Sequence, residues 1–400
     1  MLTYHSKECI LINNVMDYQT CTFCSMRFKG CLLFLVTVAF LLVQNIYLRQ
    51  NQIKIEHTAI QDSPRREITT HLSSTILNER REESENKHRY NLINISTTQI
   101  AKPLQTHVRT GRSLPVGCMI FNGRLGNLMF KYAFLHVMSK TKNLYPILPD
   151  DFELARYFTL PVYESQEQNS RRAECNTIAQ EAAQEAERWS CSYDDKFLKM
   201  SSNKKVYFLG YFQSWKYWIK HEDEIRKIFT FNTEIEEEAN ENLSNILNEM
   251  GFRDSSTGVV VGIHSRRGDY LSKPAMDYGY ITPNETYYLN AMRYFREKFP
   301  TKRIFFIAAS NDIDWLRQKL NKEENVFFLQ ENQPFMDMAI LALCDHVIMS
   351  SGTFGWWAGW MTKGIVVYYK HIFVPKSYFS HAFRGGDISD FIYPGWVGMT

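Results

Sequence analysis

Short apolar runs alternate with amphipathic segments along the C-terminal part of this chain, from Gly258 onward. The runs "GVVVGI", "RIFFIAA", "VFFL" and "GIVVYY" are almost continuously apolar, as strands must be when both faces of their sheet are covered. A regular strand–helix alternation builds a parallel sheet with helices on both faces. The sequence therefore predicts an α/β domain at residues 253–400. We expect its strands at 258–264, 303–309, 325–329, 346–349 and 364–369, and its helices near 284–298, 312–321, 334–343 and 354–362.

The region from residue 113 to residue 252 has a less regular pattern, which nevertheless favours a second α/β domain. The runs "VGCMIF" and "KKVYFLGYF" are typical of strands, and the first is followed by the loop "NGRLGN" and an amphipathic helix that reaches Lys140. The segment 234–250 predicts a helix with an acidic outer face. The insert 164–188 is polar, and we expect it to lie on the surface. We expect a hinge between the two domains near 250–257.

An uncharged stretch of nineteen residues precedes this folded part, from Gly30 to Leu48, with Arg27 and Lys29 before it and Arg49 after it. As a helix it would span about 28 Å, close to the thickness of the hydrocarbon core of a bilayer. A cleaved signal peptide would begin nearer the N-terminus and end in a small-residue cleavage site, and a buried core helix would be shorter. We favour a transmembrane signal-anchor at 30–48, with residues 1–29 cytosolic and the rest lumenal.

Residues 49–112 are polar and rich in charge. Such a segment cannot bury enough apolar surface to fold alone, so we expect a disordered stem. A lumenal location would also permit disulfides. Three pairings are open to the cysteines of the folded part; the sequence favours Cys175–Cys191 because it closes a short loop, whereas Cys118 and Cys344 lie in apolar runs typical of a core. Sequons for N-glycosylation stand at Asn94, Asn242 and Asn284.

Several classes of function find no support in the composition or the motifs. The formal net charge is only +3, so no basic field indicates a nucleic-acid partner. No "GxxxxGK" or "GxGxxG" follows a predicted strand, which argues against P-loop and dinucleotide-binding proteins. The "DID" at Asp312–Asp314 resembles the DxD of metal-dependent sugar transferases, but acidic residues are also common at a helix start, and we expect no metal.

Clusters of polar residues follow three of the predicted strands, those at 258–264, 303–309 and 346–349. The carboxyl ends of parallel strands meet at one edge of a sheet, where open α/β folds bind ligands. The convergence of the clusters at that edge predicts a binding site more strongly than any one of them. The clusters are His264, Arg266, Arg267 and Asp269; Ser310, Asn311 and Asp312; and Ser350, Ser351, Gly352 and Thr353.

The composition of these clusters favours an anionic ligand, above all a diphosphate. Arginine forks match phosphate oxygens, and a helix that starts at the "SSGT" turn leaves free amides that attract phosphate. Other interpretations remain open. Arg266 and Arg267 could pair with Asp269 and neighbouring acids, and the turn could be an ordinary N-cap. His264 could be a buried strand residue bonded to a neighbour, and Trp215 could contact a sugar.

In these motifs the chain resembles the α-1,2-fucosyltransferases. The resemblance covers roughly Pro115 to the C-terminus, and the patterns "HxRRGDY" and "GTFGxWA" are its most specific parts. Two departures stand out: Leu128 replaces the glutamine that usually follows "GRLGN", and Ser265 stands where valine is common. The matching segments are "GRLGN" (123–127), "FLGYFQSW" (208–215), "VGIHSRRGDY" (261–270), "DMAILALCDHVIMSSGTFGWWAGWM" (337–361) and, weakly, "YPGW" (393–396).

The resemblance implies a single-pass Golgi membrane enzyme of type II with a lumenal catalytic domain. It would transfer fucose from GDP-fucose to the 2-hydroxyl of a terminal β-galactoside on a glycoprotein or glycolipid, with inversion at the anomeric carbon and with neither metal nor other cofactor. The implied fold is GT-B, with two Rossmann-like domains and the donor bound in the C-terminal one. The alternatives are a fucosyltransferase of another linkage or acceptor, and an inactive membrane-anchored glycan-binding protein.

The resemblance also implies roles for single residues. Arg267 and Asp269 would act in catalysis, with Asp269 either the base or a group that orients the arginines; Asp277 is a second candidate base, and the departing diphosphate could take the proton instead. Asp337 would accept a hydrogen bond from the guanine. Donor-binding residues would be His264, Arg266, Arg267, Asn311, Asp337, Ser350, Ser351 and Thr353. Gly123, Arg124, Asn127 and Trp215 would lie on the acceptor side of the cleft.

Overall fold

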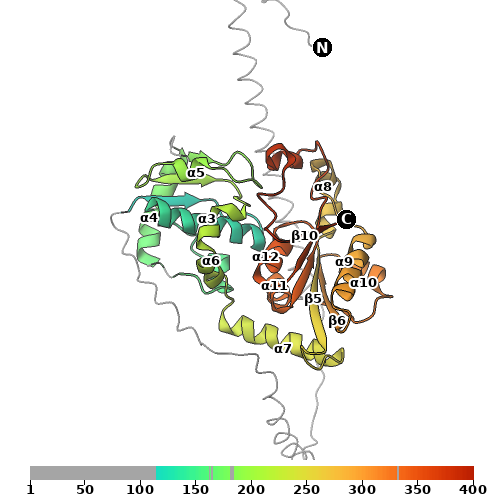
Figure 1. Ribbon diagram of the computed structural model, residues 1–400. Coiled ribbons are helices and arrows are strands. Elements are labelled where there is room, and N and C mark those ends of the chain that lie inside the picture. Colours follow the sequence, from blue (N-terminus) through green and yellow to red (C-terminus); the bar gives the residue numbers. More distant parts are fainter. Residues whose placement is uncertain (1–113, 162, 164, 181–183, 331–332) are drawn as a thin grey trace, which may run out of the picture. The chain divides into compact units, whose positions relative to one another are not determined.

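The computed structural model describes residues 114–161, 163, 165–180, 184–330 and 333–400 (Figure 1). The predicted cytosolic tail, signal-anchor and stem and the sequon at Asn94 lie outside these residues. No helix in the described part combines the length and the apolar character needed to cross a membrane. The described residues build two parallel sheets with helices packed against them, as the sequence predicts for both halves.

The first sheet has the strand order β2-β1-β4-β3, and every neighbouring pair is parallel. α3 (Leu125–Lys142) packs against it and is buried along almost its whole length. The strands and the helix that we expected around "VGCMIF", "KKVYFLGYF" and the segment up to Lys140 are therefore confirmed, but the helix is buried on almost all sides and is not amphipathic as expected. The other elements of this half are β1 (Val116–Met119), β2 (Tyr145–Pro146), α4 (Ser165–Gln180), β3 (Gln184–Ala186), α5 (Lys196–Lys199) and β4 (Val206–Leu209).

The polar insert 164–188 is more than surface, contrary to the expectation. It forms α4 and β3, and α4 packs against β1 through Cys175 and Ile178, which are buried in one cluster with Val116. Gln168 is buried as well, and its side chain donates to a backbone carbonyl of β2 at 2.8 Å. Only a few residues of α4 are buried, so the average polarity of the segment does not reveal its buried face.

The same packing decides the disulfide. Cys118 on β1 is bonded to Cys175 on α4, with 5.7 Å between their Cα atoms, while Cys191 and Cys344 are free and buried. The predicted pair Cys175–Cys191 is therefore wrong. A short sequence separation makes loop closure less costly in the unfolded chain, but the contact between α4 and β1 determines which thiols meet in the folded one.

The second sheet has the strand order β10-β9-β8-β5-β6-β7 and is again parallel throughout. Its central strand β5 pairs with β6 and β8 and is buried along its whole length. The strands that we expected in this half are confirmed; β10 was not expected, because "VGM" is too short to form an apolar run. The strands are β5 (Gly258–Ser265), β6 (Arg303–Ser310), β7 (Val326–Phe328), β8 (His346–Met349), β9 (Val366–Tyr369) and β10 (Val397–Met399).

Helices cover both faces of this second sheet (Figure 1). On one face, α9 and α10 pack on a cluster that includes Val259, Val261 and Ile263 of β5. On the other face, α11 and α12 pack on a cluster that includes Val260. This is the two-sided burial that the apolar runs predicted. The helices, confirmed to within a few residues, are α9 (Glu285–Lys298), α10 (Ile313–Leu320), α11 (Pro334–Leu343) and α12 (Thr353–Met361); short α8 (Lys273–Tyr278) follows β5.

One hydrophobic core continues from the first half into the second. The start of α3 lies against the start of α12, where Trp357 donates from Nε1 to the carbonyl of Gly126, 3.0 Å away. Trp218, Trp356 and Trp360 are buried around this contact. The chain passes between the halves through α6 (Glu222–Ile228) and α7 (Thr233–Glu249), which confirms the helix expected at 234–250. The "GRLGN" and "SSGT" segments, far apart in the sequence, are thereby brought together.

Candidate active site

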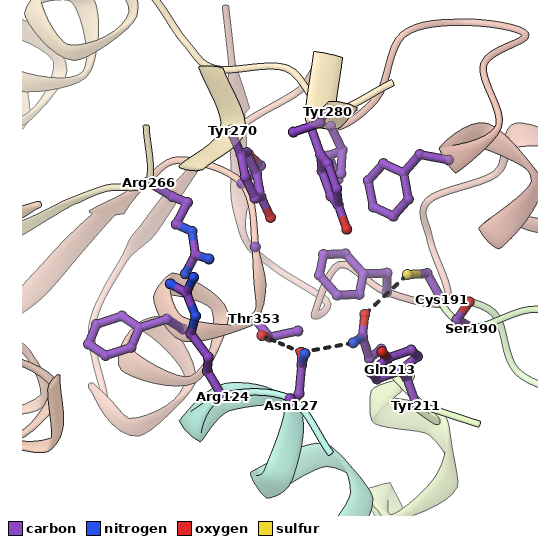
Figure 2. A pocket seen from close by; sticks show the side chains of 18 of the residues that line it. Arg124, Asn127, Ser190, Cys191, Tyr211, Gln213, Arg266, Tyr270, Tyr280 and Thr353 are labelled. Atoms are coloured by element: carbon purple, nitrogen blue, oxygen red, sulfur yellow. Dashed lines mark hydrogen bonds between the residues drawn. The ribbon is translucent and has the colours of Figure 1, made fainter. Parts of the chain in front are cut away.

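A cavity of about 360 Å³ lies where the two halves meet, beside the starts of α3 and α12 (Figure 2). Both halves supply its walls, so neither sheet forms the site alone. Of the predicted site residues, those that line the cavity are Gly123, Arg124, Asn127, His264, Arg266, Asp269, Ser351 and Thr353. The other lining residues are Ser190, Cys191, Tyr211, Gln213, Tyr270, Ala275, Tyr278, Tyr280, Gly352, Phe354, Ile372, Phe379, Phe383 and Phe391.

Charged side chains form one end of the cavity. Asp269, in the turn after β5, accepts both arms of the Arg266 fork, at 2.9 and 2.6 Å. Arg124 reaches the same carboxylate from the first half at 3.4 Å, and Asn311 donates to it at 2.9 Å. Burial by itself would raise the pKa of Asp269, but the hydrogen bond and the charge of Arg266 outweigh it and hold the pKa below its usual range. Asp269 is therefore an anion at neutral pH.

Arg267 does not share this end of the cavity, which corrects the expectation of a paired arginine site. Its guanidinium lies over the ring of Trp315, 4.0 Å from the ring centre, and its Nε is 3.2 Å from a carboxylate oxygen of Asp312. Arg267 lies beyond the end of β5, at the start of a short turn with φ −140° and ψ −59°, and its side chain leaves the cavity there. The other interpretation of the sequence, in which the arginines pair with nearby acids, describes both side chains: Arg266 with Asp269, and Arg267 with Asp312.

His264, near the end of β5, is buried and lines the cavity. Burial, followed by the positive charge of Arg266, lowers the pKa of His264 to about 3, so the imidazole is neutral. Its Nδ1 has no hydrogen-bond partner among the described residues, unlike a buried histidine bonded to a neighbour. The ring stacks on Phe354 of α12, with 4.7 Å between the centroids. This nitrogen faces α12, since a Cβ added at Gly355 would lie 2.6 Å from it.

The hydroxyl groups of the "SSGT" turn have different surroundings. Ser350 is fully buried, and its Oγ accepts from the backbone amide of Arg266 at 2.7 Å. It thus holds the backbone that carries the guanidinium. Ser351 and Thr353 line the cavity itself. Ser351 donates to a backbone carbonyl at 3.1 Å, and Thr353 donates to Oδ1 of Asn127 at 2.8 Å.

A row of hydrogen bonds crosses the cavity between the two halves (Figure 2). Oδ1 of Asn127 accepts from Thr353 on α12 and also from Nε2 of Gln213, 3.1 Å away. The thiol of Cys191 donates in turn to Oε1 of Gln213 at 3.3 Å. Asn127 therefore ties the start of α3 to the start of α12 and to the wall that carries Gln213.

Aromatic side chains form the wall of the cavity beside Arg266, whose guanidinium carbon lies 5.2 Å from the centre of the Tyr270 ring (Figure 2). Tyr270 stacks on Tyr280, with 4.2 Å between the centroids, and Tyr280 contacts Phe379 at 4.5 Å. The hydroxyl groups of Tyr270 and Tyr280 are directed into the cavity. Tyr211 lines the cavity from the first half, next to Gln213 (Figure 2). Ring faces together with hydroxyl groups suit a ligand such as a sugar, which has both apolar and polar surface.

Several predicted residues lie outside the walls of this cavity. Trp215 donates from Nε1 to the carbonyl of Ser389 at 3.1 Å. Asp337 lies in the first turn of α11. Asn311 supports the backbone of the charged end, because its Oδ1 accepts from the backbone amide of Arg267 at 2.8 Å. Asp277 is exposed and pairs with a lysine one helical turn away, at 2.8 Å.

The acidic residues that resembled a metal motif have other partners. Asp312 pairs with Arg267 at 3.2 Å, and Asp314 is exposed and lies 3.6 Å from Arg317. Among the described residues, no group of three or more His, Cys, Asp or Glu side chains is placed to hold a metal ion.

Some lining residues were not predicted from the sequence. Tyr211 and Gln213 lie inside the segment "FLGYFQSW", and Tyr270 ends "RRGDY", so the motifs contained a signal for them that their residue types alone did not show. Cys191 was considered only as a disulfide partner. Tyr280 belongs to no motif, and only the folding of its loop against Tyr270 brings it to the site.

Comparison with known families agrees with this arrangement. The model described as glycosyl transferase family 11 matches residues 89–400. The chain belongs to glycosyl transferase family 11. A relative in this family, galactoside alpha-(1,2)-fucosyltransferase 1 of Lagothrix lagotricha, is 31% identical over 287 residues, which cover 70% of this chain and 73% of the relative. The protein of the same name from Saimiri sciureus is 29% identical over 287 residues, with the same coverage.

Solved structures of fucosyltransferases resemble this family 11 chain at lower identity. POFUT1 in complex with GDP is 12% identical, with a TM-score of 0.38 over 62% of this chain and 93% of that chain. NodZ from Bradyrhizobium is 14% identical, with a TM-score of 0.37 over 62% of this chain and 94% of that chain. The family match and the named relatives, and not these structures, show that the protein is a glycosyltransferase; its family 11 relatives are named as fucosyltransferases.

Proposed function

We propose that this glycosyltransferase moves L-fucose from GDP-fucose to the 2-hydroxyl of a terminal β-galactoside and forms an α-1,2 linkage. The names of its relatives give that linkage and that class of acceptor. In the chain itself, the observation that carries the proposal is the cavity, in which a cationic end and a helix start meet a polar and aromatic wall. These parts match the two substrates, a nucleoside diphosphate sugar and a sugar acceptor. Two parallel sheets with the site between them support a GT-B-like fold.

The diphosphate of the donor would lie between Arg266 and the start of α12. A phosphate oxygen can replace a carboxylate oxygen on the Arg266 fork, and Asp269 would still be held by Arg124 and Asn311. Ser351 and the first amides of α12 would donate hydrogen bonds, and the helix dipole would add to them. The contact of Asp337 with the guanine stays a prediction for the part of the donor beyond this cavity.

The reaction would be an in-line displacement with inversion. The oxygen of the acceptor 2-hydroxyl forms a bond to C1 of fucose while the bond from C1 to the β-phosphate oxygen breaks. The electron pair of that bond leaves with GDP, and a β-linked donor gives an α-fucoside. Arg266 would stabilise the negative charge that grows on the diphosphate. The proton of the hydroxyl would be released to solvent water, because in-line attack places the departing diphosphate on the opposite face of the fucose ring.

Asp269 fits the role of a positioning residue better than that of the base. Its carboxylate accepts from Arg266, Arg124 and Asn311. Its pKa lies below the usual range, and an efficient base has a pKa near the working pH. We therefore assign Asp269 to orienting Arg266 and Arg124. We assign Arg266, and not Arg267, to the diphosphate.

For the cellular location we propose a Golgi protein of type II, anchored by 30–48, with the described residues lumenal. The disulfide between Cys118 and Cys175 is of a kind that persists in an oxidising compartment. Of the predicted glycosylation sites, Asn284 is exposed and Asn242 lies half-buried on α7.

The purified full-length chain, GDP-fucose and a panel of sugars test the proposed function. We expect GDP release with β-galactosides, and nuclear magnetic resonance of the product should show an α-1,2-linked fucose. Another linkage would identify a different fucosyltransferase. GDP-fucose or glycan binding without transfer would favour a glycan-binding protein.

The same assay tests the metal-free mechanism. Turnover should be unchanged in EDTA, because the cationic groups of the protein are assigned the charge of the diphosphate. A loss of turnover that added Mg²⁺ or Mn²⁺ restores would contradict this assignment.

A further inference from the structure

A shielded carboxylate that the proposed reaction does not use lies directly behind the cavity wall. Glu187 follows β3, and its two oxygens accept from consecutive backbone amides, that of Tyr211 at 2.6 Å and that of Phe212 at 2.8 Å. Its own amide donates to the carbonyl of Leu209 at 2.9 Å. Because Tyr211 lines the cavity, this carboxylate is one residue removed from the site.

The turn that Glu187 holds has an unusual backbone. Phe212 has a φ of 53°, a left-handed conformation that strains a bulky residue. The bond from its amide to Glu187 and the stacking of its ring on Phe134, with 3.7 Å between the centroids, offset that strain. A Cβ added at Gly210 would lie 2.4 Å from the carboxyl carbon of Glu187. The carboxylate therefore packs tightly against the turn and determines its course.

The course of this turn places the next residue in the site. The amide of Gln213 donates to the carbonyl of Ser190 at 2.9 Å, and its side chain donates to Asn127 at 3.1 Å. Glu187 thus sets the positions of two lining groups on the wall of the first half, the ring of Tyr211 and the amide of Gln213.

Lys131 of α3 supports the same wall. Its ammonium group lies 4.5 Å from the centre of the Tyr211 ring and donates to the carbonyl of Ile120 at 2.9 Å. Ile120 belongs to the segment that leads to Gly123 and the predicted cleft residues. Lys131 therefore joins the turn behind the wall to the loop before α3.

We propose that Glu187 is a positioning residue for the acceptor sugar: its carboxylate holds the Tyr211–Gln213 turn, and the turn presents a ring and an amide to the sugar that receives fucose. This inference rests on the function proposed above. A tyrosine ring covers an apolar sugar face, and a glutamine amide both donates to and accepts from sugar hydroxyls. The donor end is built from other residues, Arg266 and the start of α12, so donor binding should be independent of Glu187.

Protonation of Glu187 would weaken the turn, because a carboxylic acid has one oxygen that donates instead of accepting. Burial raises the pKa of Glu187 to about 7, although its bonds to the amides of Tyr211 and Phe212 and the charge of Lys131 lower it. The carboxylate that holds the turn is therefore lost as the pH falls through 7. We expect the KM for the acceptor to rise as the pH falls from 7.5 to 5.5, while the KM for GDP-fucose stays constant.

The other titratable groups that face Glu187 do not change their charge between pH 5.5 and 7.5 in a way that would explain this pH dependence of the acceptor KM. Burial keeps the pKa values of Cys191, Tyr211 and Tyr217 above their usual range, so these groups stay neutral. Asp194 stays ionised, because the hydrogen bond from its arginine partner outweighs burial and lowers its pKa. Burial lowers the pKa of Lys131 to about 8, so it is largely protonated up to pH 7.5.

Glu187→Gln is the decisive variant, because glutamine has the same shape and, like the protonated acid, a single accepting oxygen. Loss of one such bond, about 1–1.5 kcal/mol, corresponds to an increase of about tenfold in the KM for the acceptor at pH 7.5. The variant should also lose the pH dependence of that KM. Glu187→Asp keeps the charge and should keep the pH dependence. The matched control is Glu185→Gln on β3, two residues before Glu187. The carboxylate of Glu185 pairs with Lys196 at 3.1 Å, and this variant should change neither KM.

Calorimetry with GDP-fucose separates this inference from the proposed function. Wild type and Glu187→Gln should bind GDP-fucose equally well. A wild type that binds GDP-fucose but transfers to no β-galactoside would contradict the proposed function. A wild type that transfers, together with a Glu187→Gln variant of unchanged acceptor KM and pH profile, would overturn the inference. Weakened binding of both substrates would overturn it as well, since it would show a general structural role.

Lys131→Met provides a second test that does not depend on the folding of the Glu187 variants. Methionine keeps most of the side chain over Tyr211 but removes the charge that lowers the pKa of Glu187. The pH profile of the acceptor KM should shift to higher pH. An unshifted profile in a folded variant, judged by its melting temperature, would overturn the inference.

Discussion

At the scale of single residues, two arginines that are adjacent in the sequence have separate roles. The side chains of Arg266 and Arg267 are equally exposed, at 20% each, so burial does not distinguish them. Their partners do: Arg266 binds Asp269 at the cavity, whereas Arg267 lies on Trp315 and beside Asp312. The first is placed to bind an anion, and the second holds its loop to α10.

Replacement of each arginine by lysine tests this division. Arg266→Lys should lower kcat/KM for GDP-fucose about 10- to 100-fold, because one ammonium group cannot make the forked contact and each charged hydrogen bond contributes about 1.5–3 kcal/mol. Arg267→Lys is the matched control and should have a smaller effect on turnover. Steady-state kinetics and GDP calorimetry measure both. A larger loss of kcat/KM in the Arg267 variant would contradict this division and favour a site in which both arginines bind the diphosphate.

At the scale of elements, the site depends on the close approach of two helix starts. A Cβ added at Gly126 would lie 2.6 Å from the backbone carbon of Thr353 and 2.8 Å from the amide nitrogen of Phe354. Backbone atoms within a helix start cannot yield as the end of a flexible side chain can. The packing of the two helices thus requires the second glycine of "GRLGN", Gly126. The close approach that it permits also allows the hydrogen bond between Asn127 and Thr353.

Gly126→Ala should therefore force α3 away from α12. We expect a loss of about 1–3 kcal/mol in the free energy of unfolding from overpacking and a loss of transfer activity well beyond that expected from the fraction unfolded. Denaturant unfolding and kinetics measure the two effects. Gly117→Ala on β1 is the control: its nearest new contact would be the end of the Leu144 side chain at 3.2 Å, and it should remain active. Equal loss in both variants would contradict the role of the helix contact.

The disulfide joins two elements of the first half, β1 and α4. It closes a loop of 57 residues, and removal of a native disulfide typically costs about 2–5 kcal/mol. We expect the variant Cys118→Ala/Cys175→Ala to melt at a lower temperature than the wild type. A reductant should lower the melting temperature of the wild type and leave that of the variant unchanged. A wild type insensitive to reductant under unfolding conditions would show that this bond is not formed.

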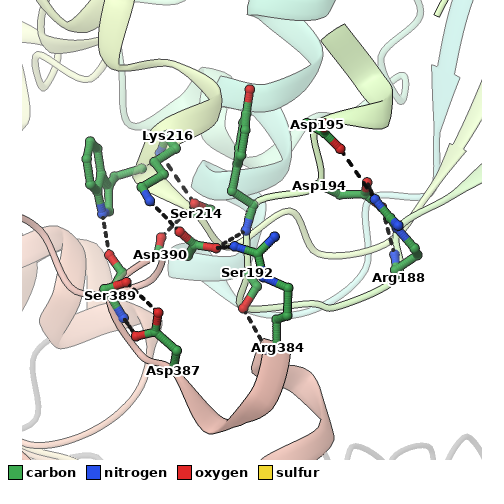
Figure 3. A network of polar contacts seen from close by, with 12 residues as sticks. Arg188, Ser192, Asp194, Asp195, Ser214, Lys216, Arg384, Asp387, Ser389 and Asp390 are labelled. Atoms are coloured by element: carbon green, nitrogen blue, oxygen red, sulfur yellow. Dashed lines mark hydrogen bonds and ion pairs between the residues drawn. The ribbon is translucent and has the colours of Figure 1, made fainter. Parts of the chain in front are cut away.

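At the scale of the whole described part, the C-terminal segment holds the two halves together through Asp390 (Figure 3). Asp390 is buried and accepts from Lys216 at 2.5 Å, from the amide of Tyr193 at 2.9 Å and from Arg384 at 3.3 Å. Its backbone carbonyl accepts from Ser214 at 2.6 Å. A single carboxylate thus joins two loops of the first half to the segment that supplies Phe383 and Phe391 to the cavity.

Asp390→Asn should loosen this junction, because the amide presents an NH2 group to donors that need an acceptor. Breaking a buried charged contact of this kind costs about 2–4 kcal/mol. We expect a lower melting temperature and a raised KM for both substrates, since both walls of the cavity would move. Asp387→Asn is the control, because the Asp387 side chain is exposed and accepts only from Ser389 among the described residues. Equal melting temperatures for the two variants would contradict the role of Asp390.

The sequence by itself determined the parallel sheet of the C-terminal half and the edge of that sheet beside which the cavity lies. Strands covered on both faces require continuous apolar runs, which are visible without a structure, and the residues after those runs must emerge at one edge. His264, Arg266, Asp269, Ser351 and Thr353 were found in this way. The "GRLGN" segment became part of the site only through the family resemblance.

Tertiary structure alone decided which neighbouring side chains face the cavity and which distant ones join them. Asn127 and Thr353 are 226 residues apart in the sequence, and no local pattern encodes their contact. The same holds for the disulfide of Cys118 and for Glu187 behind the wall that carries Gln213. Local propensity and burial act along one segment at a time, whereas these contacts depend on how whole helices and sheets pack against one another.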